Sequence, residues 1–489
     1  MFRGLTALAF AIAALPLYGQ IKIGTLDFER CELGKGLAAV KASCAYLSVP
    51  ENHDAGEGKG TVKLHVALLR STAKNPPLDP VVFIAGGPGQ SGSESIGNIL
   101  HGFFDILKVR HVIVIDQRGT GKSLKLSCQW NEDEQLDVDD AAVDRLLREA
   151  AERCRKKWET SVEKPDLAQY TTTAAVQDME LVRIALAAPQ LNLAGFSYGT
   201  RVAQQYAKRY PAQTRSLILD GIAPNNIALG ADFARVLDQS LAANFARCSS
   251  DETCKARFGD SAATLKALQA SWATRINLKI PDPRTGLFID AQMSLASLQT
   301  VARMFAYSSE YAAMLPLLLD EAVKGRPAPL LAQTHMTGES LSDAISYGMQ
   351  LSVMCAEDAP VYKADPQDSE RLLGTGFSKV YTQQCAVWPK GVRPVDFAEP
   401  LRGALPALLI SGELDPVTPP EYGDEVLKTL TNAMHVVVSQ HGHINLGRGC
   451  MPKLAAQFLD TLAPKSLDLS CVKKIKPAPF FLEFTGAAP

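Results

Sequence analysis

A serine flanked by glycines is the residue of this sequence best suited to covalent chemistry. Ser197 lies in the pentapeptide GFSYG, between an apolar stretch, LNLAG, and an amphipathic stretch, TRVAQQYAKRY. In this context the G-x-S-x-G pattern predicts a tight strand-to-helix turn that lifts the serine hydroxyl above a sheet. The turn requires small flanking residues and leaves backbone N–H groups free at the helix start. Ser197 is therefore the candidate nucleophile, the alternative being an ordinary glycine-rich turn.

A serine at its ordinary pKa is a weak nucleophile and needs a histidine base, which a carboxylate must orient. After a G-x-S-x-G serine the chain order is acid and then histidine. Asp415 follows the apolar stretch ALLISG, and His443 follows HVVVS. Loops after parallel strands meet at one edge of a sheet, so we predict Asp415 as the orienting acid and His443 as the general base. Glu413 and His441 are the alternatives, and His435 is expected to be structural.

The segment VVFIAGGPGQSG has two interpretations. As the loop after a strand it would supply one backbone N–H of an oxyanion hole, from Gly87 or Gly86, with Tyr198 giving the second. Two such donors stabilise the charge that develops on a carbonyl oxygen, each by roughly 3 kcal/mol. Residues 87–92 also fit G-x-G-x-x-G, and the next strand ends at Asp116, which is the formal dinucleotide-binding pattern of an oxidoreductase.

The dinucleotide interpretation does not account for the serine, acid and histidine that follow in hydrolase order. The segment GTGKS at 119–123 similarly resembles the end of a phosphate-binding P-loop, but Asp116 occupies the position of its first glycine. We therefore expect acyl transfer without a metal or an organic cofactor. A catalytically silent binding protein is a further alternative, although it would normally lack one of the three residues.

The elements that must position these residues alternate between strand and helix. Apolar stretches typical of buried strands occur at TVKLHVALLR, VVFIA, HVIVID, LNLAG, SLILDG, ALLISG and HVVVS, with amphipathic stretches between them. This pattern predicts an α/β fold with a mostly parallel central sheet and helices on both faces. Between SLILDG and ALLISG, the fifth and sixth of these stretches, the spacing of the apolar residues is that of helices. We predict a core at 21–228 and 404–489, with a helical cap inserted at 229–403.

Composition limits the partners. The chain has 489 residues, of which 46% are hydrophobic and 21% charged, so it can bury a sizeable core and is not disordered. Fifty basic and 52 acidic residues give a formal net charge of -2, so no basic surface is expected for nucleic acid or for an anionic membrane. A small molecule or a peptide is the expected substrate. The sequence leaves the oligomeric state open.

The N-terminus and the cysteines both indicate export. Residues 1–20 carry one arginine and then an apolar run of about 14 residues, which is typical of a secretory signal peptide and too short for a membrane anchor. The ten cysteines form no metal-ligand spacing, and their even number favours disulfides. About 945 pairings are conceivable. Spacing favours near neighbours: 31 with 44, 128 with 154, 248 with 254, 355 with 385, and 450 with 471. The expected location is secreted or periplasmic.

Several motifs together resemble a known family. GGPG at 86–89, DQRGTGKS at 116–123, GFSYGT and the late DPVTPP are similar to those of secreted α/β-hydrolase serine peptidases of the tripeptidyl aminopeptidase and prolyl iminopeptidase group. The resemblance extends from about residue 40 to Cys471, and the C-terminal region is the part most like the tripeptidyl aminopeptidases. Ala85 departs from the histidine common in prolyl iminopeptidases, which affects the expected substrate preference.

The resemblance implies the α/β-hydrolase fold and cleavage of peptide bonds near a free N-terminus through an acyl-enzyme. It also implies acidic cap residues that bind the substrate amine, for which Glu357 and Asp358 are candidates and a surface charge is the alternative. Thr418 is expected to hydrogen-bond within the Asp415 loop, with simple capping of the turn as the alternative. The same machinery would serve a carboxylic ester hydrolase, which is the alternative function.

Overall fold

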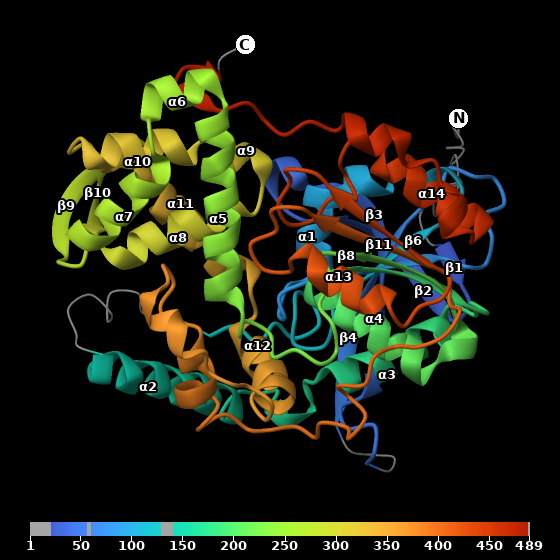
Figure 1. Cartoon of the computed structure of the whole chain (residues 1–489). Coiled ribbons are helices and arrows are strands. Elements are labelled where there is room, and N and C mark those ends of the chain that lie inside the picture. The colour runs from blue at the N-terminus through green and yellow to red at the C-terminus, as the bar shows by residue number, and fades with distance from the viewer. Residues whose placement is uncertain (1–20, 56–59, 129–139, 488–489) are drawn as a thin grey trace, which may run out of the picture.

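The computed structural model describes residues 21–55, 60–128 and 140–487. The predicted signal peptide, 1–20, lies outside the described residues. The molecule has a strand-rich core and a separate group of helices beside it (Figure 1). No helix among the described residues is long and apolar enough to cross a membrane.

A ten-stranded sheet forms the centre of the core. Its spatial order is β1-β2-β3-β4-β6-β5-β7-β8-β11-β12. The strands are β1 (Ile21–Ile23), β2 (Leu26–Leu33), β3 (Val40–Pro50), β4 (Thr61–Leu69), β5 (Val81–Ile84), β6 (Val112–Ile115), β7 (Leu191–Phe196), β8 (Thr214–Asp220), β11 (Ala407–Gly412) and β12 (Ala433–Val438). The last six in spatial order are parallel to one another, as predicted.

The first four strands were not all predicted. Strands β1 to β4 pair antiparallel, and β4 joins β6 antiparallel, so they extend the parallel part on one side. The sequence indicated β4 but not β1, β2 or β3. In β2 the buried Leu26, Phe28 and Leu33 are separated by exposed charged residues. Such a strand is stabilised by its neighbours, and its own sequence carries only a weak hydrophobic signal.

Helices cover both faces of the sheet, as predicted. The side chains of each strand point alternately to the two faces, and they build two separate hydrophobic clusters. One cluster includes helices α3 (Thr172–Ala185), α4 (Tyr198–Arg209) and α13 (Pro420–Leu427), and the other includes α1 (Gly92–Ile99) and α14 (Met451–Thr461). Both faces are therefore closed to water around the central parallel strands, which explains why β5, β6, β7, β8 and β11 are almost continuously apolar.

Between β8 and β11 the chain is mostly helical. This segment contains α5 (Phe233–Ser250), α6 (Glu252–Phe258), α7 (Ser261–Ser271), α8 (Leu295–Ala306), α9 (Ser309–Ala312), α10 (Leu315–Val323), α11 (Ala328–Ala344) and α12 (Tyr347–Val353). Several of these helices share a hydrophobic cluster of their own. A hairpin, β9 (Ile276–Pro281) and β10 (Phe288–Met293), was not predicted, because most of its side chains are at least partly exposed. We call residues 229–403 the insertion, with these bounds as our proposal.

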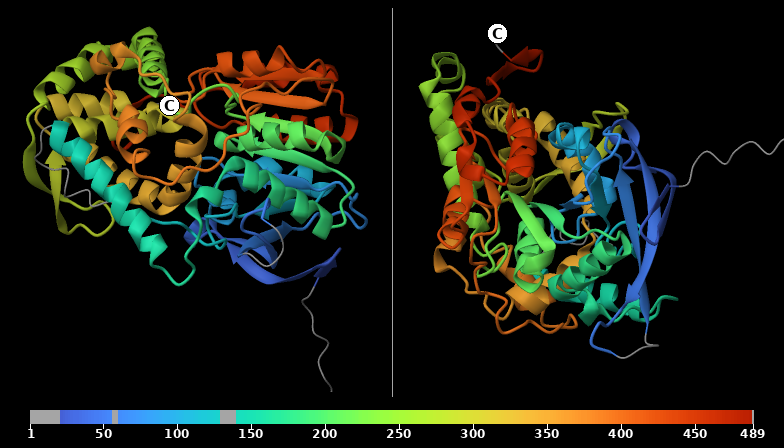
Figure 2. Two further views of the ribbon diagram at one scale, coloured as in Figure 1. Left: turned by 90° about the horizontal axis from the view of Figure 1, so that it is seen from below. Right: turned by 90° about the vertical axis from the view of Figure 1, so that its right-hand side faces the viewer.

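Two segments from outside the insertion pack against it (Figures 1 and 2). Helix α2 (Asp140–Glu159) precedes the nucleophile in sequence, yet its Asp144 contacts Lys379 at 3.0 Å and Gln383 at 3.1 Å. The C-terminal segment crosses from the core to the insertion, where Phe480 is buried in a cluster with the Cys248–Cys254 pair. A short hairpin of β13 (Phe481–Glu483) and β14 (Gly486–Ala487) follows. The insertion is therefore fastened to the core by more than its own two ends.

All five predicted disulfides are confirmed. The bonds join Cys31 to Cys44, Cys128 to Cys154, Cys248 to Cys254, Cys355 to Cys385 and Cys450 to Cys471, and no cysteine is free. Each closes a short loop, as the near-neighbour spacing indicated. A set of disulfides of this size is typical of proteins that fold in an oxidising compartment.

Candidate active site

Ser197 lies in the turn between β7 and α4. Its backbone has φ 55° and ψ -124°, a conformation that non-glycine residues rarely adopt. The glycines on either side are required by close approach, because a Cβ on Gly195 would lie 2.4 Å from the Gly199 carbonyl oxygen. A Cβ on Gly199 would lie 2.2 Å from the Ile84 carbonyl oxygen. The strained turn presents Ser197 at the carboxyl edge of the parallel strands.

Asp415 and His443 are joined by a short hydrogen bond. The distance between Asp415 Oδ2 and His443 Nδ1 is 2.6 Å, and both side chains are nearly inaccessible. The other oxygen, Oδ1, accepts hydrogen bonds from the N–H groups of Val417 and Thr418. Thr418 Oγ1 lies 2.9 Å from Asp415 Oδ2 and 3.1 Å from His443 Nδ1. The carboxylate is thus fixed, and it orients the imidazole so that Nε2 is left for a proton transfer.

The alternative residues have other partners. Glu413 is exposed and accepts hydrogen bonds from Ser439 Oγ and Gln440 N, which supports the turn before the histidines. His441 Nδ1 lies 2.8 Å from the Ser439 carbonyl oxygen, and burial lowers the pKa of its imidazole. His435 contacts Asp424 and Ser411. Of these three histidines, His443 is the one that the fold places on Asp415.

Strand β8 brings the nucleophile and the histidine to the same place. The N–H of Ser197 donates to the Asp220 carbonyl oxygen at 2.9 Å. The next residue, Gly221, lies against His443, since a Cβ there would be 2.7 Å from His443 Cε1. The backbone of Ser197 and the imidazole of His443 therefore both lie against the end of strand β8.

The glycine-rich loop after β5 lies beside Ser197. A Cβ on Gly86 would lie 3.0 Å from Ser197 Cβ. Gly87 has φ 104° and is followed by a cis peptide bond to Pro88. Two serines at the end of this loop, Ser91 and Ser93, hydrogen-bond to Asp116 at the end of β6. These hydrogen bonds hold the loop in place. The Asp116 carboxylate therefore binds serines of the protein, whereas the dinucleotide interpretation would have it bind a ribose.

Tyr198 points its side chain into a buried polar network. Its hydroxyl lies 2.7 Å from Thr172 Oγ1, which donates to Glu357 Oε2 at 2.6 Å, and Thr172 N donates to Oε1. Burial, assisted by the charge of Asp358, raises the pKa of Glu357 to about 8, although the hydrogen bonds from Thr172 oppose this shift. Asp358 pairs with Arg201 of α4 at 2.7 Å. The structure thus places Asp358 against α4, the helix that follows Ser197, and Glu357 against Thr172 at the start of α3.

Two residues near the histidine were not singled out from the sequence. Tyr307 lies at the end of α8 in the insertion, and its backbone carbonyl oxygen accepts a hydrogen bond from His443 N at 2.8 Å. Its ring packs edge-on against the imidazole, with 5.3 Å between the ring centroids. Asp220 is completely buried beside the serine. Asp220 could have been noticed, because it ends an apolar strand just before a glycine, as Asp415 follows ALLISG. No pattern in the sequence indicated Tyr307.

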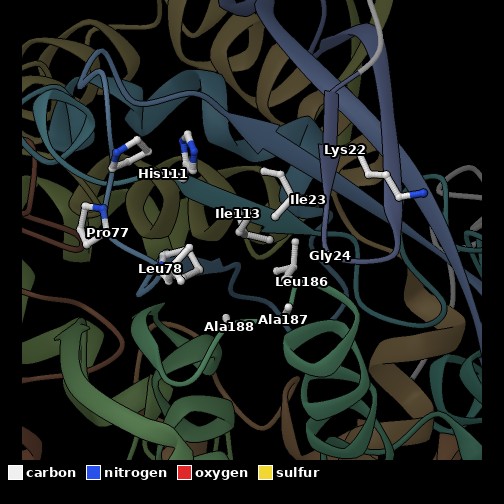
Figure 3. A pocket seen from close by; sticks show the side chains of 12 residues that line it. Lys22, Ile23, Gly24, Pro77, Leu78, His111, Ile113, Leu186, Ala187 and Ala188 are labelled. Atoms are coloured by element: carbon white, nitrogen blue, oxygen red, sulfur yellow. The ribbon is translucent and has the colours of Figure 1, made fainter.

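A pocket of about 360 Å³ lies at the opposite edge of the sheet (Figure 3). Its lining includes Pro80 and Ala188, which precede β5 and β7, and His111, which precedes β6. Since Ser197 follows β7, this pocket is separated from it by the length of the strand. It takes no part in the chemistry discussed here. Among the described residues no group of three or more His, Cys, Asp or Glu side chains is placed to hold a metal ion.

Comparison with known proteins agrees with this geometry. A family described as the alpha/beta hydrolase fold matches residues 79–448. Serine protease Hip1 of Mycobacterium tuberculosis is 25% identical over 458 residues, which cover 86% of this chain and 85% of that protein. Tripeptidyl aminopeptidase of Streptomyces lividans is 23% identical over 491 residues, covering 93% of this chain and 88% of that protein.

Among solved structures, proline iminopeptidase from Mycobacterium smegmatis is 15% identical, covers 86% of this chain and 100% of its own, and has a TM-score of 0.38. The family match spans most of the core and the whole insertion. The matched residues include Ser197, Asp415 and His443. The chain is therefore a member of the alpha/beta hydrolase family, and it is a serine hydrolase.

Proposed function

We propose that the protein is an exported peptidase that releases residues or short peptides from free N-termini, with Ser197, His443 and Asp415 as its catalytic triad. The observation that carries this proposal is the 2.6 Å hydrogen bond between Asp415 and His443 next to the strand end that holds Ser197. The names of its relatives, a serine protease and a tripeptidyl aminopeptidase, favour peptides over esters as substrates.

The mechanism follows from the positions of these groups. His443 Nε2 removes the proton from Ser197 Oγ as this oxygen attacks the substrate carbonyl carbon, and Asp415 stabilises the resulting imidazolium. Backbone N–H groups of Gly87 and Tyr198 hold the carbonyl oxygen as it becomes negative. His443 then protonates the leaving amine, which departs and leaves an acyl group on Ser197. A water molecule, deprotonated by His443, hydrolyses this ester and regenerates the serine.

Recognition of the free N-terminus is the finer part of the proposal. Glu357 and Asp358 stay our prediction for binding the substrate amine. Both are buried and already bonded, Glu357 to Thr172 and Asp358 to Arg201. A substrate amine would therefore have to compete with these partners for the carboxylates. The alternative for the two acids is that they hold the active-site elements in place.

A matched substrate panel tests the proposal. It comprises tripeptidyl and aminoacyl amides with a free amine, the same amides with a blocked amine, and a short-chain ester, each assayed with the wild type and with Ser197→Ala. We expect hydrolysis of the free-amine amides by the wild type and none by the variant. Hydrolysis of the ester alone would make the protein an esterase with the same mechanism. Activity that survives Ser197→Ala would overturn the assignment of the nucleophile.

Export is the second finer part. It is supported by the pattern of residues 1–20 and by the five disulfides. N-terminal sequencing of the protein recovered from an exported fraction tests it. We expect a mature chain that starts close to residue 21, and a chain recovered only from the cytoplasm with its N-terminus intact would contradict export.

A further inference from the structure

Asp220 is a buried carboxylate to which the mechanism above assigns no role. It is the last residue of β8, with no exposed surface, and it pairs in register with Phe196, the residue before the nucleophile. Its carbonyl oxygen accepts the hydrogen bond from Ser197 N at 2.9 Å. The backbone of Asp220 is thus hydrogen-bonded to the backbone of Ser197.

The side chain of Asp220 contacts a different part of the site. Its Oδ2 accepts hydrogen bonds from the N–H groups of Asn445 at 2.7 Å and Leu446 at 2.6 Å. These residues lie two and three positions after His443 in the loop after β12. One residue therefore holds the serine through its main chain and the histidine loop through its side chain.

The histidine loop needs such an anchor because part of its backbone is strained. Ile444, between His443 and the two donors, has φ 67°. A β-branched residue in this left-handed region is an outlier that persists only where surrounding contacts enforce it. Asp220 supplies two of these contacts on the C-terminal side of Ile444, and Tyr307 supplies one at the N–H of His443.

The imidazole of His443 has little free space on the side of Gly221, so a shift of the loop would displace it. Gly221 leaves no room for a side chain, since a Cβ there would lie 2.7 Å from His443 Cε1 and 3.2 Å from Ile444 Cδ1. Because Gly221 leaves the imidazole no room to shift toward β8, a relaxed loop would carry it away from the strand end to which Ser197 is hydrogen-bonded. A displacement of about 1 Å in a reacting group is enough to slow a reaction about 100-fold.

We propose that Asp220 is a positioning residue, which fixes the distance between Ser197 and His443 by accepting the Asn445 and Leu446 N–H groups while its carbonyl oxygen holds the serine. The inference rests on the catalytic roles proposed for Ser197 and His443. It is independent of whether the substrate is a peptide or an ester.

The cost of keeping this carboxylate supports a role in function. Its other oxygen, Oδ1, has no hydrogen-bond partner among the described residues. Burial raises the pKa of Asp220 to about 7, against the hydrogen bonds from Leu446 and Asn445, and the charged groups that face it are His443 and Asp415. A buried and half-satisfied carboxylate is expensive for the folded state. The presence of Asp220 is explained if the loop that carries His443 must be held in place.

The test measures the rate at which a fluorophosphonate probe labels Ser197, in the full-length protein and its variants. This reaction needs an activated serine and no particular substrate. For Asp220→Ala we expect labelling about 100-fold slower than for the wild type, together with a lower kcat and a nearly unchanged KM. Asp220→Asn keeps an acceptor oxygen of the same length, so it should label within about threefold of the wild type.

Asp320→Ala is the matched control. Asp320 is a mostly buried acid of α10 that pairs with Arg257 and Lys324, away from the site. We expect it to lower the melting temperature without changing the labelling rate. If Asp220→Ala does not fold, Asp220→Ser replaces it with the same expectation.

The outcomes separate the two proposals. Labelling by Asp220→Ala at the wild-type rate, or labelling by Asp220→Asn as slow as by Asp220→Ala, would overturn the positioning role. A wild type that does not react with the probe would instead overturn the catalytic role of Ser197. Slow labelling by Asp220→Ala, rescued by Asp220→Asn, would support the inference.

Discussion

Thr418 shows how a neighbour of the acid contributes at the scale of one residue. Its hydroxyl lies within hydrogen-bond distance of both Asp415 and His443. Thr418→Val keeps the shape but removes the hydroxyl, and a hydrogen bond to a charged group contributes about 1.5 to 3 kcal/mol. We expect kcat to fall roughly 10- to 100-fold, with little change in KM, in steady-state assays.

Thr418→Ser is the control for this prediction, because it keeps the hydroxyl and loses only a methyl group. It should retain kcat within a few fold of the wild type. Equal activity of Thr418→Val and the wild type would mean that the hydroxyl has no part in orienting Asp415 or His443.

Glu357 predicts a dependence of stability on pH. The pKa of its carboxyl is raised by burial from 4.5 to about 8. Between these values the unfolded chain has released the proton and the folded chain keeps it, so the contribution of Glu357 to the free energy of unfolding falls as the pH rises through this window. The slope is at most about 1.4 kcal/mol per pH unit.

Glu357→Gln removes this titration while keeping the size of the side chain. We expect the melting temperature of the variant, relative to that of the wild type, to rise steadily from pH 5 to pH 8. Asp220 titrates in both proteins and cancels in the comparison. Melting temperatures of the two proteins that run parallel across this range would contradict the raised pKa.

At this scale the sequence was informative wherever chemistry requires a motif. Ser197 was indicated by its glycines, and Asp415 and His443 by their order and by the strands before them. Thr172 and Tyr307 carry no such pattern, and Asp220 carries only a weak one, as the last residue of an apolar strand before a glycine. Their importance arises from contacts such as the hydrogen bond from His443 N to Tyr307, which joins residues far apart in the chain. Only the folded arrangement reveals them.

At the scale of elements, burial decided what could be predicted. Strands β5, β6, β7 and β11 are buried throughout, β8 is buried except at Arg215, and all five were recognised as apolar stretches. Strands β2 and β9 expose many of their side chains, so their strand character depends on pairing with distant segments. The disulfide pairing was predictable because each bond joins cysteines close in sequence.

The Cys355–Cys385 disulfide leads to a prediction about elements. It joins the segment Met354–Asp358, which carries Glu357, to Cys385, the residue after the segment Val380–Gln384. The loop that it closes spans 30 residues, so its removal is expected to cost roughly 3 to 4 kcal/mol. For the double variant Cys355→Ser/Cys385→Ser we expect a lower melting temperature and a lower kcat, because Glu357 and Asp358 lose their support.

Cys248→Ser/Cys254→Ser is the matched control. This disulfide closes a span of 6 residues between α5 and α6 and contacts none of the catalytic residues. We expect a smaller loss of stability and an unchanged kcat. An equal loss of kcat in both double variants, or a loss in neither, would show that the bond at Cys355 does not act through the site.

At the scale of the whole molecule, the C-terminal segment holds the core and the insertion together. Phe480 is buried against α5, α6 and α10, while the exposed Phe484 is not. Truncation after Lys476 removes this contact, and loss of a buried phenylalanine costs about 3 to 5 kcal/mol. We expect a lower melting temperature and faster hydrogen exchange in α5 and α6. Phe480→Ala should reproduce the effect and Phe484→Ala should not, and unchanged exchange after truncation would refute it.

The insertion is held by its two ends, by α2 and by the C-terminal segment. This has a consequence for which substrates can reach Ser197. Because the insertion is held at several places, we expect it not to swing aside as a whole, so that a substrate would reach Ser197 through an opening whose width changes little. Such an opening would admit the free end of an unfolded chain and exclude a folded protein. We therefore expect native proteins to survive exposure to this enzyme intact. If the proposed peptidase function holds, its substrates would then be peptide fragments rather than folded proteins.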